Sequence, residues 1–420
     1  MRKTALFVLL VLVAAFFGQC ERNFGPLSGG SGEQPSPLQK QIVQSGNRFT
    51  FRLLQQLNSR LPGQNLFFSP LSISFALGMT LNGAADSTLA GMQKTLGLEG
   101  LSLEDINRNY RDLMLSLMQA DPAVQMEIAN SIWYDRSLQV NPDFLRINRT
   151  YFFAEVSPLN FFDPGAVNVI NAWVNEKTHG KIPQIIGQLH PGTDVMVLLN
   201  AIYFLGSWTY AFDEQGTTGG VFYPAEGDTQ HCRMMNQLNE FAYLQGADFQ
   251  AVDLPYGAGR YHMAVLLPAP EVDVGAFAAA LTAEKWNQIR SQMMQESAVQ
   301  KVALFLPKFK LRCSLREELK QSLGAMGMAR AFEAGRADFS RLSSSEGKNL
   351  FISDILHKAF VQVSEQGTEA AGATAVIVSR TSVGGPSYPM VVVDRPFLFL
   401  IWEQQTGAVL FAGKVLRLEK

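Results

Sequence analysis

The sequence lacks the patterns that mark an enzyme, a membrane-spanning protein or a nucleic-acid binder. It contains no G-x-S-x-G elbow, no H-E-x-x-H, no paired C-x-x-C and no G-x-x-x-x-G-K-[ST], and its five histidines stand singly. Charged residues make up only 17% of the chain and the net charge is −2, which argues against a nucleic-acid partner. No apolar run beyond the N-terminus is long enough to cross a bilayer. We expect no catalytic residues, no metal and no cofactor.

The first twenty residues have the pattern of an export signal. Arg2 and Lys3 precede an apolar stretch from Ala5 to Phe17, and small and polar residues lead to Cys20. A cysteine in this position predicts lipid attachment at Cys20, as in bacterial lipoproteins. Gln19 stands where that motif prefers a small residue, which favours simple secretion instead. Both alternatives predict a secreted, extracellular or periplasmic protein, and the first adds a lipid anchor to the outer cell envelope.

Composition divides the rest of the chain into a linker and one domain. Residues 21–38 are rich in glycine, serine and proline and predict a flexible tether. Residues 39–420 contain no repeat and no break in composition, which predicts a single continuous domain. We expect this domain to be a monomer.

Two chemical features of the domain leave alternatives open. Cys232 and Cys313 can pair in an oxidising compartment or remain separate buried thiols. Asn148-Arg149-Thr150 is a glycosylation sequon, which matters only in a eukaryotic source.

Helical patterns come first along the domain and strand patterns follow, which is typical of an α+β fold. Helices are expected over residues 47–61, 72–81, 103–118, 166–179 and 315–323. Strands are expected over residues 195–204, 251–255, 262–267, 302–309, 397–403 and 409–415. The first strand is a long run of almost only apolar residues and is expected to be buried on both faces. The last two are expected to form a hairpin around residues 404–407.

The segment from Glu365 to Val378 follows a strand-like alternation but then loses nearly all its bulk. Its alternate positions are small or β-branched and uncharged, namely Thr368, Ala370, Gly372, Thr374, Val376 and Val378. Glu369 has the opposite parity, so the segment can be buried as a central strand without burying a charge. Small residues are poor anchors for a permanent strand, and composition alone favours a flexible loop.

Five motifs in this order resemble those of the serpin family, over nearly the whole chain from about residue 40. They are Asn65-Leu66-Phe67-Phe68-Ser69-Pro70-Leu71-Ser72-Ile73, Asn200-Ala201-Ile202-Tyr203-Phe204 with Gly206 and Trp208, Leu306-Pro307-Lys308-Phe309, Ala337-Asp338-Phe339-Ser340 and Arg395-Pro396-Phe397-Leu398-Phe399. The small-residue segment resembles the hinge of inhibitory serpins, with Glu365, Gly367, Thr368, Glu369, Ala370, Ala371, Gly372, Ala373 and Thr374 at the hinge positions. The resemblance implies a secreted or lipoprotein bacterial serpin with three β-sheets, about nine helices and an exposed reactive loop.

The resemblance also implies a mechanism. A target protease cleaves the loop and becomes esterified through its serine, and the hinge then inserts into the large sheet, a known example of strand addition. About a dozen new hydrogen bonds at ~1 kcal/mol each would supply a drive on the order of 10 kcal/mol. Gly367 has a permissive backbone and Thr368 is small, so both are expected to move first. The implied partners are elastase-like or trypsin-like serine proteases, with cysteine proteases as further candidates.

Two further groups of residues follow from the motif matches. Ser69, Ser72, Asn200 and His357 match the shutter, a polar cluster beneath the centre of the sheet that controls its opening. Trp208 matches the tryptophan of the breach, where insertion starts. The alternative reading makes His357 and Trp208 ordinary core residues.

The scissile bond has two candidate positions. The family's count of seventeen residues from Glu365 ends at Thr381 and predicts cleavage at Thr381–Ser382, which suits elastase-like proteases. Cleavage one residue earlier, at Arg380–Thr381, suits trypsin-like proteases, whose pocket carboxylate pairs with a guanidinium. The alternative function is a non-inhibitory serpin acting as a carrier, chaperone or binding protein. Such relatives typically replace the small hinge residues, which are intact here.

Overall fold

Residues 35–368 and 388–419 are described by the computed structural model. This part contains nine α-helices: α1 (Pro37–Arg60), α2 (Pro70–Leu81), α3 (Asp86–Leu96), α4 (Leu103–Met118), α5 (Pro142–Phe152), α6 (Gly165–Lys177), α7 (Val274–Ala280), α8 (Ala283–Met293) and α9 (Glu317–Leu323). The predicted lipid site and most of the loop lie outside the described residues, namely Cys20, Glu369, Ala370, Ala371, Gly372, Ala373, Thr374, Arg380, Thr381 and Ser382.

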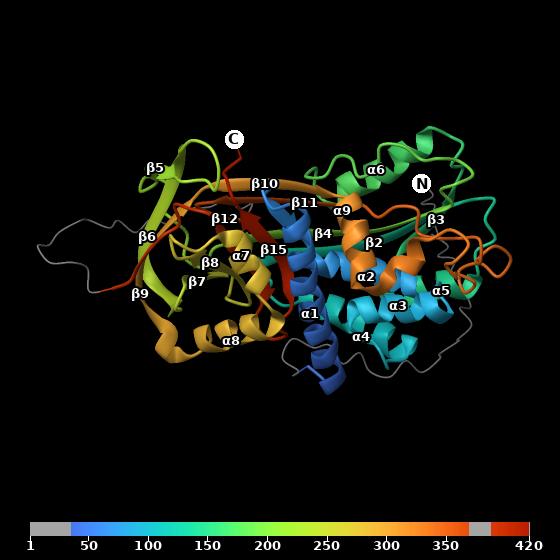
Figure 1. The fold of residues 1–420 in the computed structure, drawn as a ribbon, viewed down its shortest axis with the longest axis horizontal. Coiled ribbons are helices and arrows are strands. Elements are labelled where there is room, and N and C mark those ends of the chain that lie inside the picture. Colours follow the sequence, from blue (N-terminus) through green and yellow to red (C-terminus); the bar gives the residue numbers. More distant parts are fainter. Residues whose placement is uncertain (1–34, 369–387, 420) are drawn as a thin grey trace, which may run out of the picture.

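One sheet has six strands in the order β10-β11-β12-β4-β2-β3. Its strands are β2 (Val124–Asp135), β3 (Glu155–Leu159), β4 (Met196–Ser207), β10 (Phe309–Leu315), β11 (His357–Ser364) and β12 (Gly367–Thr368). Helix α6 covers one face of this sheet, and α2 to α5 lie on the other side (Figure 1).

The other strands form a nine-stranded array in the order β1-β15-β14-β8-β7-β6-β9-β13, with β5 beside β6. They are β1 (Leu66–Phe68), β5 (Thr218–Phe222), β6 (Gln230–Gln245), β7 (Phe249–Tyr256), β8 (Tyr261–Pro268), β9 (Val299–Pro307), β13 (Met390–Val392), β14 (Phe397–Glu403) and β15 (Val409–Val415). Strand β6 joins two groups, because residues 234–242 pair with β9 whereas residues 242–245 pair with β7. The expected α+β fold with three groups of strands is confirmed.

Helix α2 shows how local sequence starts and buries an element. Pro70 stands in the first turn, where its missing N–H costs nothing, and the Ser69 side chain accepts a hydrogen bond from the Ser72 N–H. Almost every side chain of α2 is buried, so the helix fills the space between β4 and β15. This fixed position brings Ser69 and Ser72 under the six-stranded sheet.

The structure corrects several predicted bounds. Helix α1 begins at Pro37 with Ser36 as its cap, so it starts ten residues before the predicted 47, and the predicted 21–38 linker is too long. Helix α9 begins at Glu317, because Leu315 still belongs to β10. The bounds of α4, β14 and β15 match the prediction.

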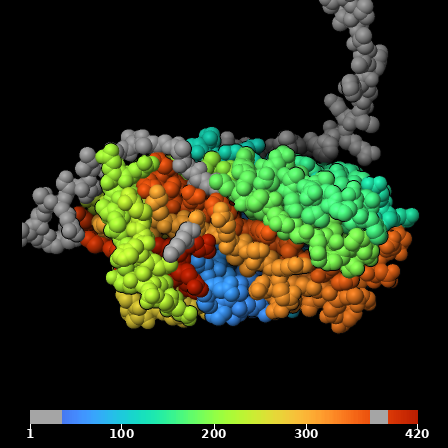
Figure 2. Space-filling view, turned by 90° about the horizontal axis from the view of Figure 1, so that it is seen from above, coloured from blue at the N-terminus to red at the C-terminus, as the bar shows by residue number. Residues whose placement is uncertain are grey.

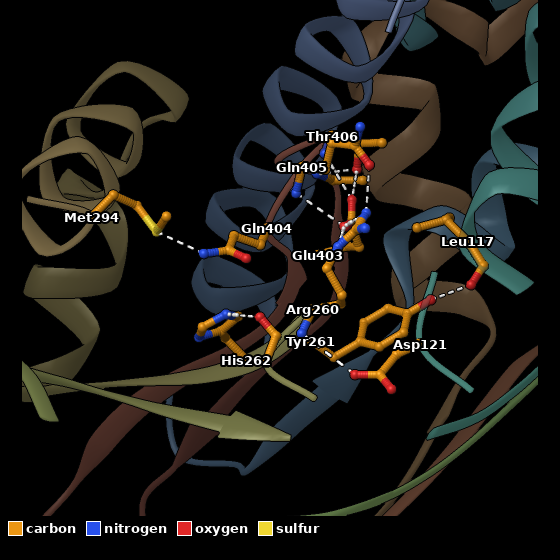
Figure 3. Close-up of polar contacts among 12 residues, drawn as sticks. Leu117, Asp121, Arg260, Tyr261, His262, Met294, Glu403, Gln404, Gln405 and Thr406 are labelled. Atoms are coloured by element: carbon orange, nitrogen blue, oxygen red, sulfur yellow. Dashed lines mark hydrogen bonds and ion pairs between the residues drawn. The ribbon is translucent and has the colours of Figure 1, made fainter. Parts of the chain in front are cut away.

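The β14–β15 hairpin is held by a buried carboxylate (Figure 3). Glu403 is 1% exposed and accepts hydrogen bonds from the backbone N–H groups of Gln405 and Thr406. Arg260, which directly precedes β8, forms an ion pair with Glu403 at 2.8 Å. The carboxylate therefore accepts hydrogen bonds from the backbone N–H groups of the turn and, through Arg260, also links the turn to β8.

Two features left open by the sequence have clear environments. Cys232 and Cys313 are free and half-buried, and burial raises the pKa of both thiols. Asn148 is 0% exposed, and its amide donates a hydrogen bond to the Phe144 carbonyl at 3.0 Å. In the folded chain this sequon cannot carry a glycan.

Candidate functional site

A gap in the six-stranded sheet separates β4 from β11. Strand β12 occupies the space between them at one end only, where Thr368 pairs with Val363 on one side and Gly206 on the other. Beyond Thr368 no described strand lies between β4 and β11, and a cavity of about 600 Å³ opens there. The central position between β4 and β11 is therefore occupied by two residues at one end and open along the rest of its length.

The gap changes the burial of β4. We expected residues 195–204 to be buried on both faces, but Met196, Val197, Leu198 and Ile202 are only half-buried. This expectation was wrong because one edge of β4 borders the cavity, although the other edge pairs with β2 throughout residues 196–206. An apolar run alone does not distinguish a fully flanked strand from one beside a gap.

The hinge residues Gly367 and Thr368 are inside the sheet rather than in an exposed loop. Gly367 has φ of 145°, and a Cβ at this position would lie 2.1 Å from the Gly206 carbonyl oxygen. Only glycine fits this close backbone approach. Thr368 is 2% exposed, and its hydroxyl lies 2.6 Å from the Tyr256 hydroxyl. Both residues are thus already in the sheet in the uncleaved chain, and their movement on cleavage stays a prediction.

Trp208 holds the hinge through its backbone and its side chain. Its N–H donates to the Gln366 carbonyl, and its indole Nε1–H donates to the Ser364 carbonyl, both at 2.9 Å. The indole stacks on Tyr256 with ring centroids 4.4 Å apart. These contacts make Trp208 more than core filler, although its part in insertion stays a prediction.

An ion pair with the exposed Lys308 anchors the buried Glu365. Its carboxylate lies 2.7 Å from the Lys308 ammonium and accepts a hydrogen bond from the Thr217 hydroxyl at 2.9 Å. Burial by itself would raise the pKa of Glu365, but the hydrogen bonds from Lys308 and Thr217 outweigh burial and the pKa is lowered. Sequence reasoning did not identify this role for Lys308, which lay in a matched motif, or Thr217.

The four predicted shutter residues converge beside the cavity. His357 Nε2 accepts a hydrogen bond from the Ser69 N–H at 3.0 Å, and the Ser69 hydroxyl donates to the Leu410 carbonyl at 2.8 Å. The Ser72 hydroxyl donates to the Asn200 carbonyl at 3.4 Å. Burial lowers the pKa of His357 to about 4, so the ring is neutral at pH 7.

Asn200 is incompletely paired in this cluster. Its Nδ2 donates to the Asn130 side chain at 2.8 Å, whereas its Oδ1 is buried with no hydrogen-bond partner among the described atoms. Asn130 is a member that the sequence did not reveal, because it comes from the centre of β2. The gating role of the cluster stays a prediction.

Residues 178–195, the crossing segment, contact both strands that border the gap. His179 packs on Tyr203 of β4 with ring centroids 4.2 Å apart. Gln184 accepts a hydrogen bond from the Lys358 ammonium of β11 at 2.7 Å. Figure 2 shows this segment and α6, in green, over one end of the sheet. A further strand would therefore have to fit beneath it.

The described residues were also compared with the requirements of metal sites and membrane spans. Within the described residues, 35–368 and 388–419, no group of three or more His, Cys, Asp or Glu side chains could hold a metal ion. No described helix is long and apolar enough to span a membrane. The site is instead the six-stranded sheet itself, in which Gly367 and Thr368 form a two-residue strand between β11 and β4. This geometry defines a class of protein whose sheet has a partly filled central position beside a cavity.

Comparison with known proteins gives the family. The serpin (serine protease inhibitor) family model matches residues 44–418. An uncharacterized serpin-like protein of Thermococcus kodakarensis is 34% identical, covering 99% of both chains, and leukocyte elastase inhibitor A of Mus musculus is 33% identical, covering 90% of this chain and 99% of its own. Human thyroxine-binding globulin superposes with a TM-score of 0.80 at 28% identity, covering 91% of this chain and 100% of its own. The chain belongs to the serpin family.

Proposed function

We propose that this chain inhibits serine proteases as a suicide substrate, by inserting its cleaved loop into the gap between β4 and β11. The proposal rests mainly on the strand register at the hinge. Thr368 is opposite Gly206 in an antiparallel pair, so each further residue of the loop would move one residue back along β4. Residues 369–378 would then face β4 from Leu205 to Met196, the first residue of that strand.

The length of the gap matches the length of the small-residue segment. The segment that loses its bulk ends at Val378, which this register places opposite Met196. The charged Arg380, which lies beyond Val378, would therefore not have to pair with β4. The agreement between these two independent lengths supports insertion of this segment.

Side-chain parity supports the same register. Thr368 faces the core, so residues 370, 372, 374, 376 and 378 would also face inward. Their side chains are small or β-branched and uncharged, which permits this burial. Glu369 would face outward beside Gln362, which is exposed. Thr374, six residues beyond Thr368, would lie between Asn200 and His357. Its hydroxyl would then reach the shutter, where the Asn200 Oδ1 lacks a partner.

Incubation with trypsin and with pancreatic elastase tests the proposal. We expect an SDS-stable complex with at least one protease and release of a C-terminal peptide that begins at Ser382 or Thr381. Arg380→Ala should abolish trapping of trypsin and leave trapping of elastase intact. Cleavage of the loop without a stable complex would favour the alternative of a carrier, chaperone or other binding protein.

We also propose export of the chain, from its N-terminal sequence alone. Mass spectrometry of the protein recovered from its native host distinguishes the routes. Diacylglycerol on Cys20 indicates a lipid anchor, and an unmodified new N-terminus near this position indicates simple secretion. An intact Met1 in the mature protein would contradict both routes.

A further inference from the structure

Tyr256 reaches the hinge from the other sheet. It lies at the end of β7 in the nine-stranded array, is 0% exposed, and places its hydroxyl 2.6 Å from the Thr368 hydroxyl. Burial raises the pKa of Tyr256, so the phenol keeps its proton and can donate or accept in this pair. The bond links the inserted end of the loop to a strand that does not belong to the gapped sheet.

The position of the Tyr256 ring is tightly fixed. Trp208 stacks on it at 4.4 Å, and Phe204 meets it edge-on at 5.1 Å. A Cβ on Gly206 would lie 2.9 Å from the ring, so the backbone of β4 also packs against it. The hydroxyl is consequently presented at one place, which only one residue of the passing strand can reach.

We infer that Tyr256 is a positioning residue that fixes the register of loop insertion by holding the Thr368 hydroxyl before the loop is cleaved. This inference rests on the proposed function. The bond places Thr368 in its final pairing with Gly206 and Val363, so insertion continues from a formed start. Without the bond the hinge can withdraw or shift, and a shift of one residue would turn Glu369 toward the core.

Removal of either hydroxyl tests the inference. Tyr256→Phe and Thr368→Val each delete one partner with little change of shape. Each should raise the number of inhibitor molecules consumed per trapped protease about threefold to tenfold, because insertion slows relative to deacylation. The double variant should be no worse than either single variant, since all three lose the same bond. Thr368→Ser keeps a hydroxyl and should remain within about twofold of the parent chain.

Tyr261 provides a matched control. It pairs with Tyr256 in the β7–β8 ladder, is also 0% exposed, and donates its hydroxyl to the Leu117 carbonyl of α4 (Figure 3). Tyr261→Phe should lower the melting temperature without changing the number of inhibitor molecules consumed. An equal rise in that number for Tyr261→Phe, or additive effects of the two test variants, would overturn the inference.

A second measurement separates this inference from the proposed function. The melting temperature of the uncleaved protein reports the Tyr256–Thr368 bond without any protease. The double variant should melt no lower than the less stable single variant, because the second change removes no further bond. If the parent chain traps neither trypsin nor elastase, the proposed function fails, and this coupling still decides whether the bond holds the hinge. Additive losses of melting temperature would show that it does not.

Discussion

The two sheets differ in how completely their backbone edges are used. In the nine-stranded array β14 pairs with β8 on one side and β15 on the other, and all seven of its residues are buried. In the six-stranded sheet β4 and β11 each pair fully along one edge, and between them only the two residues of β12 are in place. One region thus provides a complete core, while the other keeps unused pairing capacity in the same molecule.

Two histidines report this difference. In the complete array His262 lies 2.5 Å from the Asp253 carboxylate. Burial alone would lower the pKa of His262, but the nearby Asp253 charge outweighs burial and raises this pKa. Beside the gap, burial alone acts on His357 within the described part of the chain and lowers its pKa. The buried histidine is therefore paired with a charge in the complete core and neutral beside the gap.

Cleavage of the loop should give the largest effect, because it lets the gapped sheet become complete. If loop insertion stabilises the fold by on the order of 10 kcal/mol, it should raise the melting temperature by about 20 °C. Differential scanning calorimetry of intact protein and of protein cleaved between residues 379 and 383 measures the shift. Equal melting temperatures would mean that the two sheets do not differ in the way proposed here.

A defect in the complete array should instead weaken both forms alike. Trp402 is 0% exposed and packs against Trp286 and His262. Trp402→Ala should cost about 3–5 kcal/mol in the intact and in the cleaved protein, because the cavity is the same in both. Trp208→Ala is the contrasting variant and should change the difference between the two forms. Denaturant melts of all four samples check both expectations.

Acid should destabilise the gapped sheet through His357. The folded pKa of about 4 lies below the unfolded value of about 6.5, so as pH falls through this window only the unfolded state gains the proton. The resulting loss is about 2 kcal/mol at pH 5. Unfolding measured from pH 7 to pH 5 should show this slope, and His357→Gln should flatten it. His262→Gln serves as the control, because the pKa of His262 is shifted in the opposite direction.

The smallest expected effect concerns the anchor of the hinge. Lys308→Met leaves the buried Glu365 carboxylate without its cation and should cost about 1–2 kcal/mol at pH 7. The pKa of Glu365 is lowered in the fold, so its contribution is present above the unfolded value of about 4.5 and is lost as pH falls below it. Arg146→Met, in the exposed pair with Asp143, should cost almost nothing. Equal losses for both variants would deny the anchor any special role.

The sequence predicted elements best where their pattern was purely local. The bounds of α4, β14 and β15 follow from periodicity and from turn residues. The motif matches also indicated Ser69, Ser72, Asn200 and His357, which the structure does bring to one cavity. The same approach misjudged β4, because its burial depends on a neighbouring strand far away in the sequence.

Partners far apart in the sequence that lie in none of the matched clusters were not predictable. Tyr256 and Thr368 are 112 residues apart, and Thr217 and Glu365 are 148 apart. The sequence marked Thr368 as a hinge residue but did not mark Tyr256, and only the three-dimensional packing of two sheets brings them together. The sequence predicted that Gly367 and Thr368 enter the sheet first, but not that they are already paired in the uncleaved chain.

The burial of Asn148 has a consequence for the choice of expression host. Its amide bonds to the Phe144 carbonyl inside α5, and the side chain contacts no solvent. A eukaryotic secretory pathway attaches oligosaccharide to the nascent chain before this helix packs, and a glycan at residue 148 could not be enclosed afterwards. Asn148-Arg149-Thr150 would then act as a folding trap in yeast or insect cells. Bacterial expression, or Thr150→Ala in a secreting host, avoids this loss.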